Sequence, residues 1–225
     1  QELAAAKKVL SEKKPAVVIG THGLLSHTVP WTNLGLLIID EEQRFGVGQK
    51  EHLKKMRASI DILSLSATPI PRTLSMALSG LRALSIIATA PQGRKDINTV
   101  VQKESDDVIK QAIEKELERN GQVYIVSPKI RNLSMIQEIV LGLVPSARTA
   151  IAHAQLPDEE LSRIIHAFDT QEVDILISSS IIENGLDLPN VNTMIVWNAA
   201  HFGLGQLYQL RGRIGRRSRQ GFAYL

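Results

Sequence analysis

Two adjacent carboxylates follow a short apolar run in the first half of the sequence. The run LGLLIID ends at Asp40, and Glu41 comes directly after it. Ligands of open parallel sheets bind beyond the carboxyl ends of the strands, and a carboxylate desolvated there needs a positive partner. A magnesium–nucleotide complex would supply one, with Asp40 holding Mg²⁺ through water and Glu41 orienting or deprotonating the attacking water. Taken alone, the pair could also be an acidic turn that ends a strand.

Arginines gather near the C-terminus. The segment 205–219 contains Gln209, Gly212, Arg213 and Arg216 in the pattern Q-x-x-G-R-x-x-R. A helix would place the two arginines, three residues apart, on one face. Guanidinium groups there suit the charge on a transferred phosphoryl group, where an arginine finger is worth roughly 10³–10⁵ in rate. The alternative, a solvated basic helix, must accommodate two glycines at about 1 kcal/mol each.

Small polar residues follow two further apolar runs. Thr21 and His22 come after AVVIG. A hydroxyl and backbone N–H groups at a strand end suit a phosphate oxygen, although Thr21 could equally be a helix N-cap. Ser66 and Thr68 end the run DILSLSAT, where small hydroxyl groups can hydrogen-bond the acidic loop beside them.

A polar loop follows the run VDILISS in the second half. Within residues 178–190, Ser179, Glu183 and Asp187 cluster around Gly185, which allows a positive φ. Such a loop could face both the ribose of a nucleotide and the backbone of a nucleic acid.

The composition is that of an ordinary globular chain, with 225 residues of which 44% are hydrophobic and 22% charged. The net charge of +3 is too small to indicate nucleic acid by itself. No acidic residue follows Asp187, however, and the five arginines after it make a local basic surface that attracts phosphate. Aromatic residues, 4% of the chain, are too few for a base-stacking platform, so a nucleic acid would be gripped by its backbone. The absence of cysteine and of a long apolar run fits a cytosolic protein outside the membrane.

Short apolar runs alternate with amphipathic helical stretches along the chain. Eight runs rich in Val, Ile and Leu indicate parallel strands buried on both faces. They cover residues 16–20, 34–40, 61–68, 84–89, 122–127, 148–153, 173–179 and 193–198. Helical periodicity covers 104–120 and 158–170. The alternation predicts an α/β fold with a parallel sheet.

One segment breaks this rhythm. Residues 90–103 contain Pro91, Gly93 and a charge cluster, and their apolar content drops. We therefore expect a linker near 90–100, between two lobes of about four strands each. The predicted lobes cover residues 1–95 and 96–225.

Four motifs, DEEQ, SAT, ENGLD and QLRGRIGR, occur in the order used by superfamily 2 helicases and translocases. Longer stretches, among them DEEQRFGV, SATPIPRTLSMALSGLR and HFGLGQLYQLRGRIGR, resemble the motor domains of the RecG-like group. This group unites transcription-repair coupling factors with branch-migration helicases, and LSIIATAPQGR and IIENGLDLPN are more similar to the coupling-factor branch. The resemblance covers nearly the whole chain. It implies two RecA-like lobes, each with a mostly parallel sheet flanked by helices, across a cleft for ATP and Mg²⁺.

The resemblance also implies roles for individual residues of the first lobe. Asp40 and Glu41 match the magnesium-binding and water-activating pair. Gln43 belongs to the same catalytic motif and stands where the family often has His. Ser66 and Thr68 match the motif that couples hydrolysis to movement of the lobes.

Other residues match motifs that bind nucleic acid or nucleotide. Contacts with nucleic acid are implied for Thr21, His22, Arg72, Ser179 and Glu183. Contacts with the nucleotide are implied for Gly185, Asp187, Gln209, Arg213 and Arg216. The two arginines match the catalytic arginine finger, and Asn184 stands where the family more often has Thr.

The sequence lacks one element of such a motor. None of its 15 glycines is followed by lysine, so it has no G-x-x-x-x-G-K-[ST] phosphate loop. The family has this loop upstream, and we therefore expect the chain to be part of a longer protein and to be inactive alone.

The family's role implies partners for that longer protein. It would track double-stranded DNA, displace stalled RNA polymerase and recruit excision-repair proteins, the last two through parts outside this chain. Two alternatives stay open from the residues: a RecG-like branch-migration helicase, and a non-catalytic DNA-binding module that has lost its ATPase.

Overall fold

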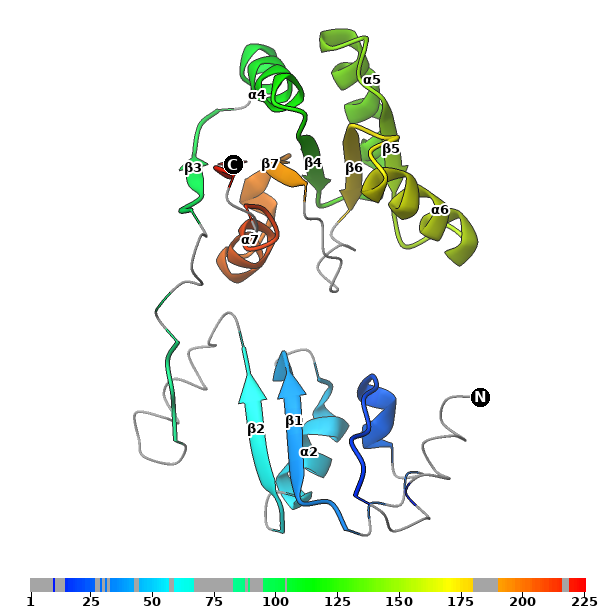
Figure 1. Cartoon of the computed structure of the whole chain (residues 1–225), viewed down its shortest axis with the longest axis vertical. Helices are drawn as coiled ribbons and strands as arrows, with labels where there is room; N and C mark the ends of the chain where they lie inside the picture. Colours follow the sequence, from blue (N-terminus) through cyan, green and yellow to red (C-terminus); the bar gives the residue numbers. More distant parts are fainter. Residues whose placement is uncertain are drawn as a thin grey trace. The chain divides into compact units, whose positions relative to one another are not determined.

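The computed structural model describes most of the chain. The described residues are 10, 15–26, 29, 31, 33–42, 45–56, 59–66, 83–87, 89, 95–103, 105–179, 190–215 and 219–225. The chain separates into two compact units, residues 1–84 and 85–225 (Figure 1). The predicted division of the lobes between residues 95 and 96 stays a prediction.

The first unit contains a two-stranded parallel sheet. Strands β1 (Leu36–Asp40) and β2 (Asp61–Leu65) pair over their full length, so their last residues are register partners. Helix α2 (Val47–Met56) connects them, and a short 3-10 helix, η1 (His22–Leu25), precedes them. The carboxyl ends of both strands therefore lie at one edge of this sheet (Figure 1).

The two faces of this sheet differ. Leu25 of η1, Ile39 of β1 and Leu53 of α2 are buried together in one cluster. The opposite face carries apolar side chains that are 45–57% exposed. These are Leu36, Ile38, Leu63 and Leu65. Burial on both faces is therefore a wrong prediction for these strands, because the described residues of this unit cover only one face.

The second unit is built on a six-stranded, all-parallel sheet. The strand order is β3-β8-β7-β4-β6-β5. The strands are β3 (Asn98–Val100), β4 (Gln122–Ser127), β5 (Thr149–Ala152), β6 (Ile175–Ser179), β7 (Val191–Val196) and β8 (Phe222–Tyr224). Every residue of β4, β6 and β7 is buried, which confirms the reading of these runs as strands covered on both faces.

Helices cover both faces of this sheet (Figure 1). They are α4 (Asp106–Glu118), α5 (Leu133–Leu143), α6 (Asp158–Asp169) and α7 (Leu204–Arg211), with short 3-10 helices η3 (Ile130–Asn132) and η5 (Ala199–His201). Val123 and Ile125 of β4 pack with α4 and α5, whereas Tyr124 and Val126 pack with α6 and α7. No helix in the described part of the chain is long and apolar enough to cross a membrane.

The two predicted helices are confirmed, and local signals explain their ends. Ser105 caps α4, its side chain accepting from the N–H of Val108 at 3.4 Å. Asn120 ends the same helix with φ of 54°, in the left-handed region that asparagine tolerates. Helix α6 begins with three acidic residues that favour the positive end of its dipole.

Two predicted strands do not form. Residues 16–20 and 84–87 lie outside both sheets, and no described residue pairs with them. Their apolar side chains are exposed, reaching 91% for Ile19 and 93% for Ile87. An apolar run becomes a strand only where a neighbouring strand takes up its backbone hydrogen bonds, and the described residues offer neither run such a neighbour.

Two strands of the second sheet are missing from the sequence-based prediction. Strand β3 lies inside the predicted linker, so that part of the linker prediction is wrong. It pairs with β8, which comes from the other end of the second unit. Both strands have only three residues, which is too short for a periodic signal.

Candidate functional site

The acidic pair lies at the carboxyl end of β1. Asp40 ends the strand and is exposed. Glu41 follows with φ of 54°, in a region that residues other than glycine rarely adopt. Its N–H donates to the carbonyl of Leu65 at 3.0 Å, which extends the β1–β2 ladder and holds this turn. Strained positions of this kind cost about 1–3 kcal/mol and cluster at functional sites.

A hydroxyl group of β2 contacts the acidic turn. Ser64 Oγ donates to Glu42 Oε2 at 2.7 Å. The sequence predicts such a contact for the hydroxyl residues at the strand end, Ser66 and Thr68. Ser66 follows β2 directly, and Thr68 lies outside the described residues. The contact with Glu42 thus comes from a serine within the strand, because the parallel register sets Ser64 opposite Ile39, near the acidic turn.

A pocket of about 280 Å³ joins the acidic pair to a histidine of the same unit. His22, Asp40, Glu41, Phe45 and Gln49 line it. His22 stands at the start of η1, Asp40 ends β1, and Glu41 follows that strand. The fold thus places an imidazole and two carboxylates on one pocket, although the family resemblance implies that this histidine contacts nucleic acid.

Thr21 has a local structural role. It is the N-cap of η1, and its side chain accepts from the N–H of Gly23 at 3.5 Å. The alternative considered from the sequence, N-capping, is therefore what this contact supports. The cap also sets the position of His22, the first residue of η1.

The donors at this pocket suit magnesium. Mg²⁺ is held by one or two carboxylates together with waters and phosphate oxygens, not by a full protein cage. Asp40 and Glu41 are two such carboxylates on one pocket wall. No group of three or more His, Asp or Glu side chains in the described ranges could hold a metal ion by itself. The residues therefore fit Mg²⁺ that arrives with a polyphosphate.

Phe45 and Gln49 are pocket residues that sequence reasoning missed. Both lie just after the acidic turn, where α2 begins. Gln49 Oε1 accepts from the N–H of Gly46 at 3.0 Å, so this side chain also caps the start of the helix. The signal that could have found them is the short spacing between the acidic turn and the next helix.

The arginine motif differs from its prediction. Helix α7 ends at Arg211, and Gly212 is its C-cap. Arg213 follows in a turn, Ile214 is fully buried, and Gly215 adopts φ of +63°. Arg213 therefore does not lie on a helix, so the prediction that it shares a helical face with Arg216 is wrong. The physical reason is that the two glycines of the motif end the helix instead of interrupting it.

Two further predicted residues lie in the second unit. Ser179 ends β6, where its carbonyl accepts from Ser178 Oγ at 2.7 Å, and it is only 4% exposed. Gln209 lies on α7 and is half-buried. The other predicted site residues lie outside the described residues. These are Gln43, Arg72, Glu183, Gly185, Asp187 and Arg216.

The parallel sheet with helices on both faces defines an α/β fold of the RecA-like helicase kind. The chain matches the helicase conserved C-terminal domain over residues 104–218, and the DEAD/DEAH box helicase family over residues 1–77. The first match covers more than half of the chain, so this chain belongs to the helicase family that carries the conserved C-terminal domain.

Curated relatives narrow this class. The chain is 50% identical to the transcription-repair-coupling factor of Haemophilus influenzae over 216 residues, which are 96% of this chain and 19% of the relative. It is 49% identical to that of Myxococcus xanthus over 224 residues, 100% of this chain and 19% of the relative. The corresponding protein of Escherichia coli is 49% identical over 216 residues. The chain thus spans about a fifth of the length of these relatives.

Solved structures agree with this fold. RecG bound to a three-way DNA junction is similar with a TM-score of 0.71 and 35% identity, over 99% of this chain and 30% of that one. Dbp5 of S. cerevisiae bound to RNA and ADP BeF3 has a TM-score of 0.58 at 15% identity, over 85% of this chain and 52% of that one. The second likeness concerns the fold alone.

Proposed function

We propose that this chain is the motor segment of a longer, ATP-dependent translocase on double-stranded DNA that acts in transcription-coupled repair. The observation that carries the proposal is the pocket that Asp40 and Glu41 line, in a chain about half identical to transcription-repair-coupling factors. In this proposal the parent protein is cytoplasmic, displaces stalled RNA polymerase and recruits excision-repair proteins through parts outside the chain.

The acidic pair would carry the hydrolytic chemistry. Asp40 would hold Mg²⁺, and Glu41 would orient the water that attacks the γ-phosphate. Mg²⁺, when bound, neutralises charge on the phosphate oxygens. The hydrogen bond of the Glu41 N–H to the carbonyl of Leu65 supports this role, because it fixes the backbone of the turn from which the carboxylate extends. Gln43 belongs to the same motif.

The second lobe would complete the nucleotide site. We propose that Arg213 and Arg216 neutralise charge that develops on the phosphoryl group. In this proposal residues 1–95 are the C-terminal part of the first lobe and residues 96–225 are the second lobe. Nucleotide contacts are proposed for Gly185, Asp187 and Gln209. Ser66 and Thr68 would couple hydrolysis to movement of the lobes.

DNA would be gripped by its backbone. The proposed contacts are Thr21, His22, Arg72, Ser179 and Glu183. Aromatic residues make up only 4% of the chain, too few for a base-stacking platform, so contacts with phosphate would supply the sequence-independent affinity. Ser179 has the least support among them, since it is buried.

The exposed apolar face of β1 and β2 supports a longer protein. Contiguous apolar surface of this kind marks an interaction site, and the relatives are about five times as long as the chain. We propose that the remainder of the first lobe, with its phosphate loop, covers Leu36, Ile38, Leu63 and Leu65.

RecG-like branch migration is the second candidate. The likeness to RecG on a three-way DNA junction favours it. The two candidates share the motor chemistry and differ in what the motor moves. Displacement of a stalled RNA polymerase and migration of a branched junction, each measured with the full-length protein, separate them.

Substitutions in the two proposed catalytic groups test the motor itself. Glu41→Gln or Arg213→Ala in the full-length protein should lower kcat for DNA-stimulated ATP hydrolysis by about 10²–10³-fold or more, since each removes a group that acts in the transition state. Steady-state phosphate release measures this. Turnover within twofold of wild type in either variant would contradict the catalytic role assigned to that residue.

Matched controls come from exposed helix positions. Glu51→Gln on α2 makes the same chemical change as Glu41→Gln, and Arg163→Ala on α6 the same change as Arg213→Ala. Both control proteins should keep their turnover. If wild type binds DNA without hydrolysing ATP, the non-catalytic module replaces the motor proposal.

A further inference from the structure

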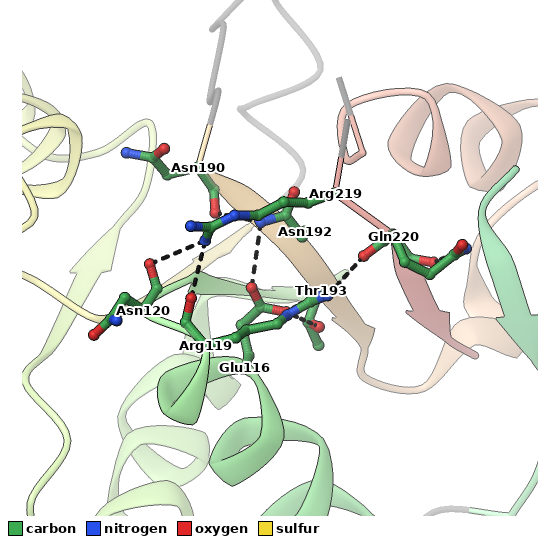
Figure 2. Close-up of polar contacts among 9 residues, drawn as sticks. Glu116, Arg119, Asn120, Asn190, Asn192, Thr193, Arg219 and Gln220 are labelled. Carbon is green, nitrogen blue, oxygen red and sulfur yellow. Dashed lines mark hydrogen bonds and ion pairs between the residues drawn. The ribbon is translucent and has the colours of Figure 1, made fainter. Parts of the chain in front are cut away.

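A buried carboxylate stands at the centre of a polar network in the second unit (Figure 2). Glu116 of α4 is 1% exposed. It accepts from Arg119 Nε at 3.0 Å and from Asn192 Nδ2 at 3.3 Å, and also from Arg119 Nη2 and Thr193 Oγ1. A buried charge persists only where partners of this kind replace water. The network therefore ties α4 firmly to β7.

Arg119 extends this network to the segment that follows the arginine motif. Its Nη1 donates to the carbonyl of Gln220 at 3.0 Å. Its guanidinium also lies 5.2 Å from the ring centroid of Phe222 in β8. The side chain of Arg119 thus contacts Glu116 as well as Gln220 and Phe222. Figure 2 shows its contact with Gln220.

Arg219 also contacts the end of helix α4. Its Nη1 donates to the carbonyls of Arg119 at 3.0 Å and Asn120 at 3.4 Å. These carbonyls lie at the C-terminus of α4, where a cation satisfies orphan acceptors and complements the helix dipole. Gln220 Nε2 in addition donates to the carbonyl of Asp96.

Gly215 and Gly221 have backbone contacts of their own. The N–H of Gly215 donates to the carbonyl of Val191 at 3.4 Å. A Cβ on Gly221 would lie 3.3 Å from the Cα of Gly215, so the two glycines are in close backbone contact. Residues 215 and 221 thus meet next to the arginine motif, residues 209–216. The contacts that Arg119 and Arg219 make with α4 and with residues 220 and 222 lie beside this meeting point.

We propose that Glu116, Arg119 and Arg219 are positioning residues for the arginine motif. They hold residues 219–222, which follow the motif, against α4 and β7, so that Arg213 meets the polyphosphate in one orientation. This inference rests on the proposed function. It also means that the guanidinium of Arg219 binds the carbonyls at the end of α4 and does not bind a phosphate group of the nucleotide or the DNA. Arg211, whose guanidinium lies 4.7 Å from the ring centroid of Tyr208, likewise has a partner within the unit.

Two variants of the full-length protein test the proposal. Arg119→Lys keeps a cation beside Glu116 but loses the planar fork that reaches both partners. Arg219→Gln removes the cation at the end of α4 from an exposed position. Each should lower kcat for ATP about tenfold with KM within about threefold, because the arginine acts in the transition state. Amide exchange over residues 212–221 should rise about tenfold, measured by mass spectrometry.

Arg148→Gln is the control, since it breaks the ion pair with Asp174, and none of the contacts described above for Glu116, Arg119 and Arg219 involves Arg148. It should leave kcat and the exchange of residues 212–221 unchanged. The proposal is overturned if either Arg119→Lys or Arg219→Gln leaves kcat within twofold of wild type, or leaves that exchange unchanged. A wild-type protein without ATPase activity contradicts the proposed function instead, and the exchange experiment then still decides whether the contacts anchor the segment.

Discussion

At the residue scale, Gly121 is required by a neighbouring side chain. A Cβ at this position would lie 1.6 Å from Glu116 Oε1 and 2.6 Å from its Cδ. Glu116 cannot swing aside easily, because it is buried and held by Arg119, Asn192 and Thr193. The clash is with a side chain only five residues earlier, whereas Asn192 and Thr193, which help to hold that side chain in place, lie far along the chain.

Gly121→Ala should therefore destabilise the protein by about 1–3 kcal/mol, the usual cost of overpacking. Gly142→Ala is the matched control, because nothing lies within 4 Å of its Cβ position near the end of α5. That change should be neutral or stabilise by up to about 1 kcal/mol. Chemical denaturation of both variants measures the difference, and equal stability of the two would contradict the packing argument.

The arginine motif shows how residue patterns mislead at short range. A three-residue spacing predicts a shared helical face for Arg213 and Arg216, yet α7 ends before both. Gly212 and Gly215 carry the missing information, since glycine is favoured at helix ends and at positive φ. The pattern identifies the residue types of the motif, whereas the two glycines determine its backbone conformation.

At the element scale, an ion pair joins the beginnings of β5 and β6. Arg148 Nη2 lies 2.6 Å from Asp174 Oδ1, and both Nε and the backbone N–H of Arg148 donate to Asp174 Oδ2. Burial by itself raises the pKa of Asp174, but the hydrogen bonds and charge of Arg148 outweigh it, so the pKa lies below its ordinary value of 3.8.

A lowered pKa means that the folded state binds this proton less tightly than the unfolded state does. The stability gained from ionised Asp174 is therefore present above pH 3.8 and is lost as pH falls through the folded pKa. The difference in unfolding midpoint between wild type and Asp174→Asn should be constant above about pH 5 and should shrink below it. Urea denaturation across this range measures it. In Arg148→Gln the acid-dependent loss should be smaller, and an unchanged loss would contradict the assigned cause.

Element prediction succeeds where an element is self-contained. Helices α4 and α6 carry their own periodicity and end signals, and both form as predicted. The run at 16–20 has the composition of a strand but no described partner, so composition alone misleads there. Strand β3 has almost no signal of its own and exists because β8 pairs with it.

At the scale of the whole molecule, the two units differ in completeness. The second contains a six-stranded sheet covered on both faces, whereas the described sheet of the first has two strands and one exposed apolar face. The sequence has no phosphate loop. Both observations agree with the proposal that the chain is part of a longer motor protein.

The purified 225-residue chain should accordingly hydrolyse ATP at least about 10³-fold more slowly than the full-length protein, since it lacks the cradle for the β- and γ-phosphates. Phosphate release at equal molar concentrations, with saturating DNA, measures both. Robust hydrolysis by the chain alone would mean that another group binds these phosphates.

The sequence by itself determined the helicase class, the alternation of strands and helices, and the residue types of the motifs, because these depend on local composition and order. The tertiary structure decided which residues share the pocket with Asp40, where the arginine motif leaves its helix, and that Glu116, Arg119 and Arg219 meet beside it. The reason is that parallel pairing and buried polar networks join residues far apart in the chain, and such contacts leave no periodic trace in the sequence.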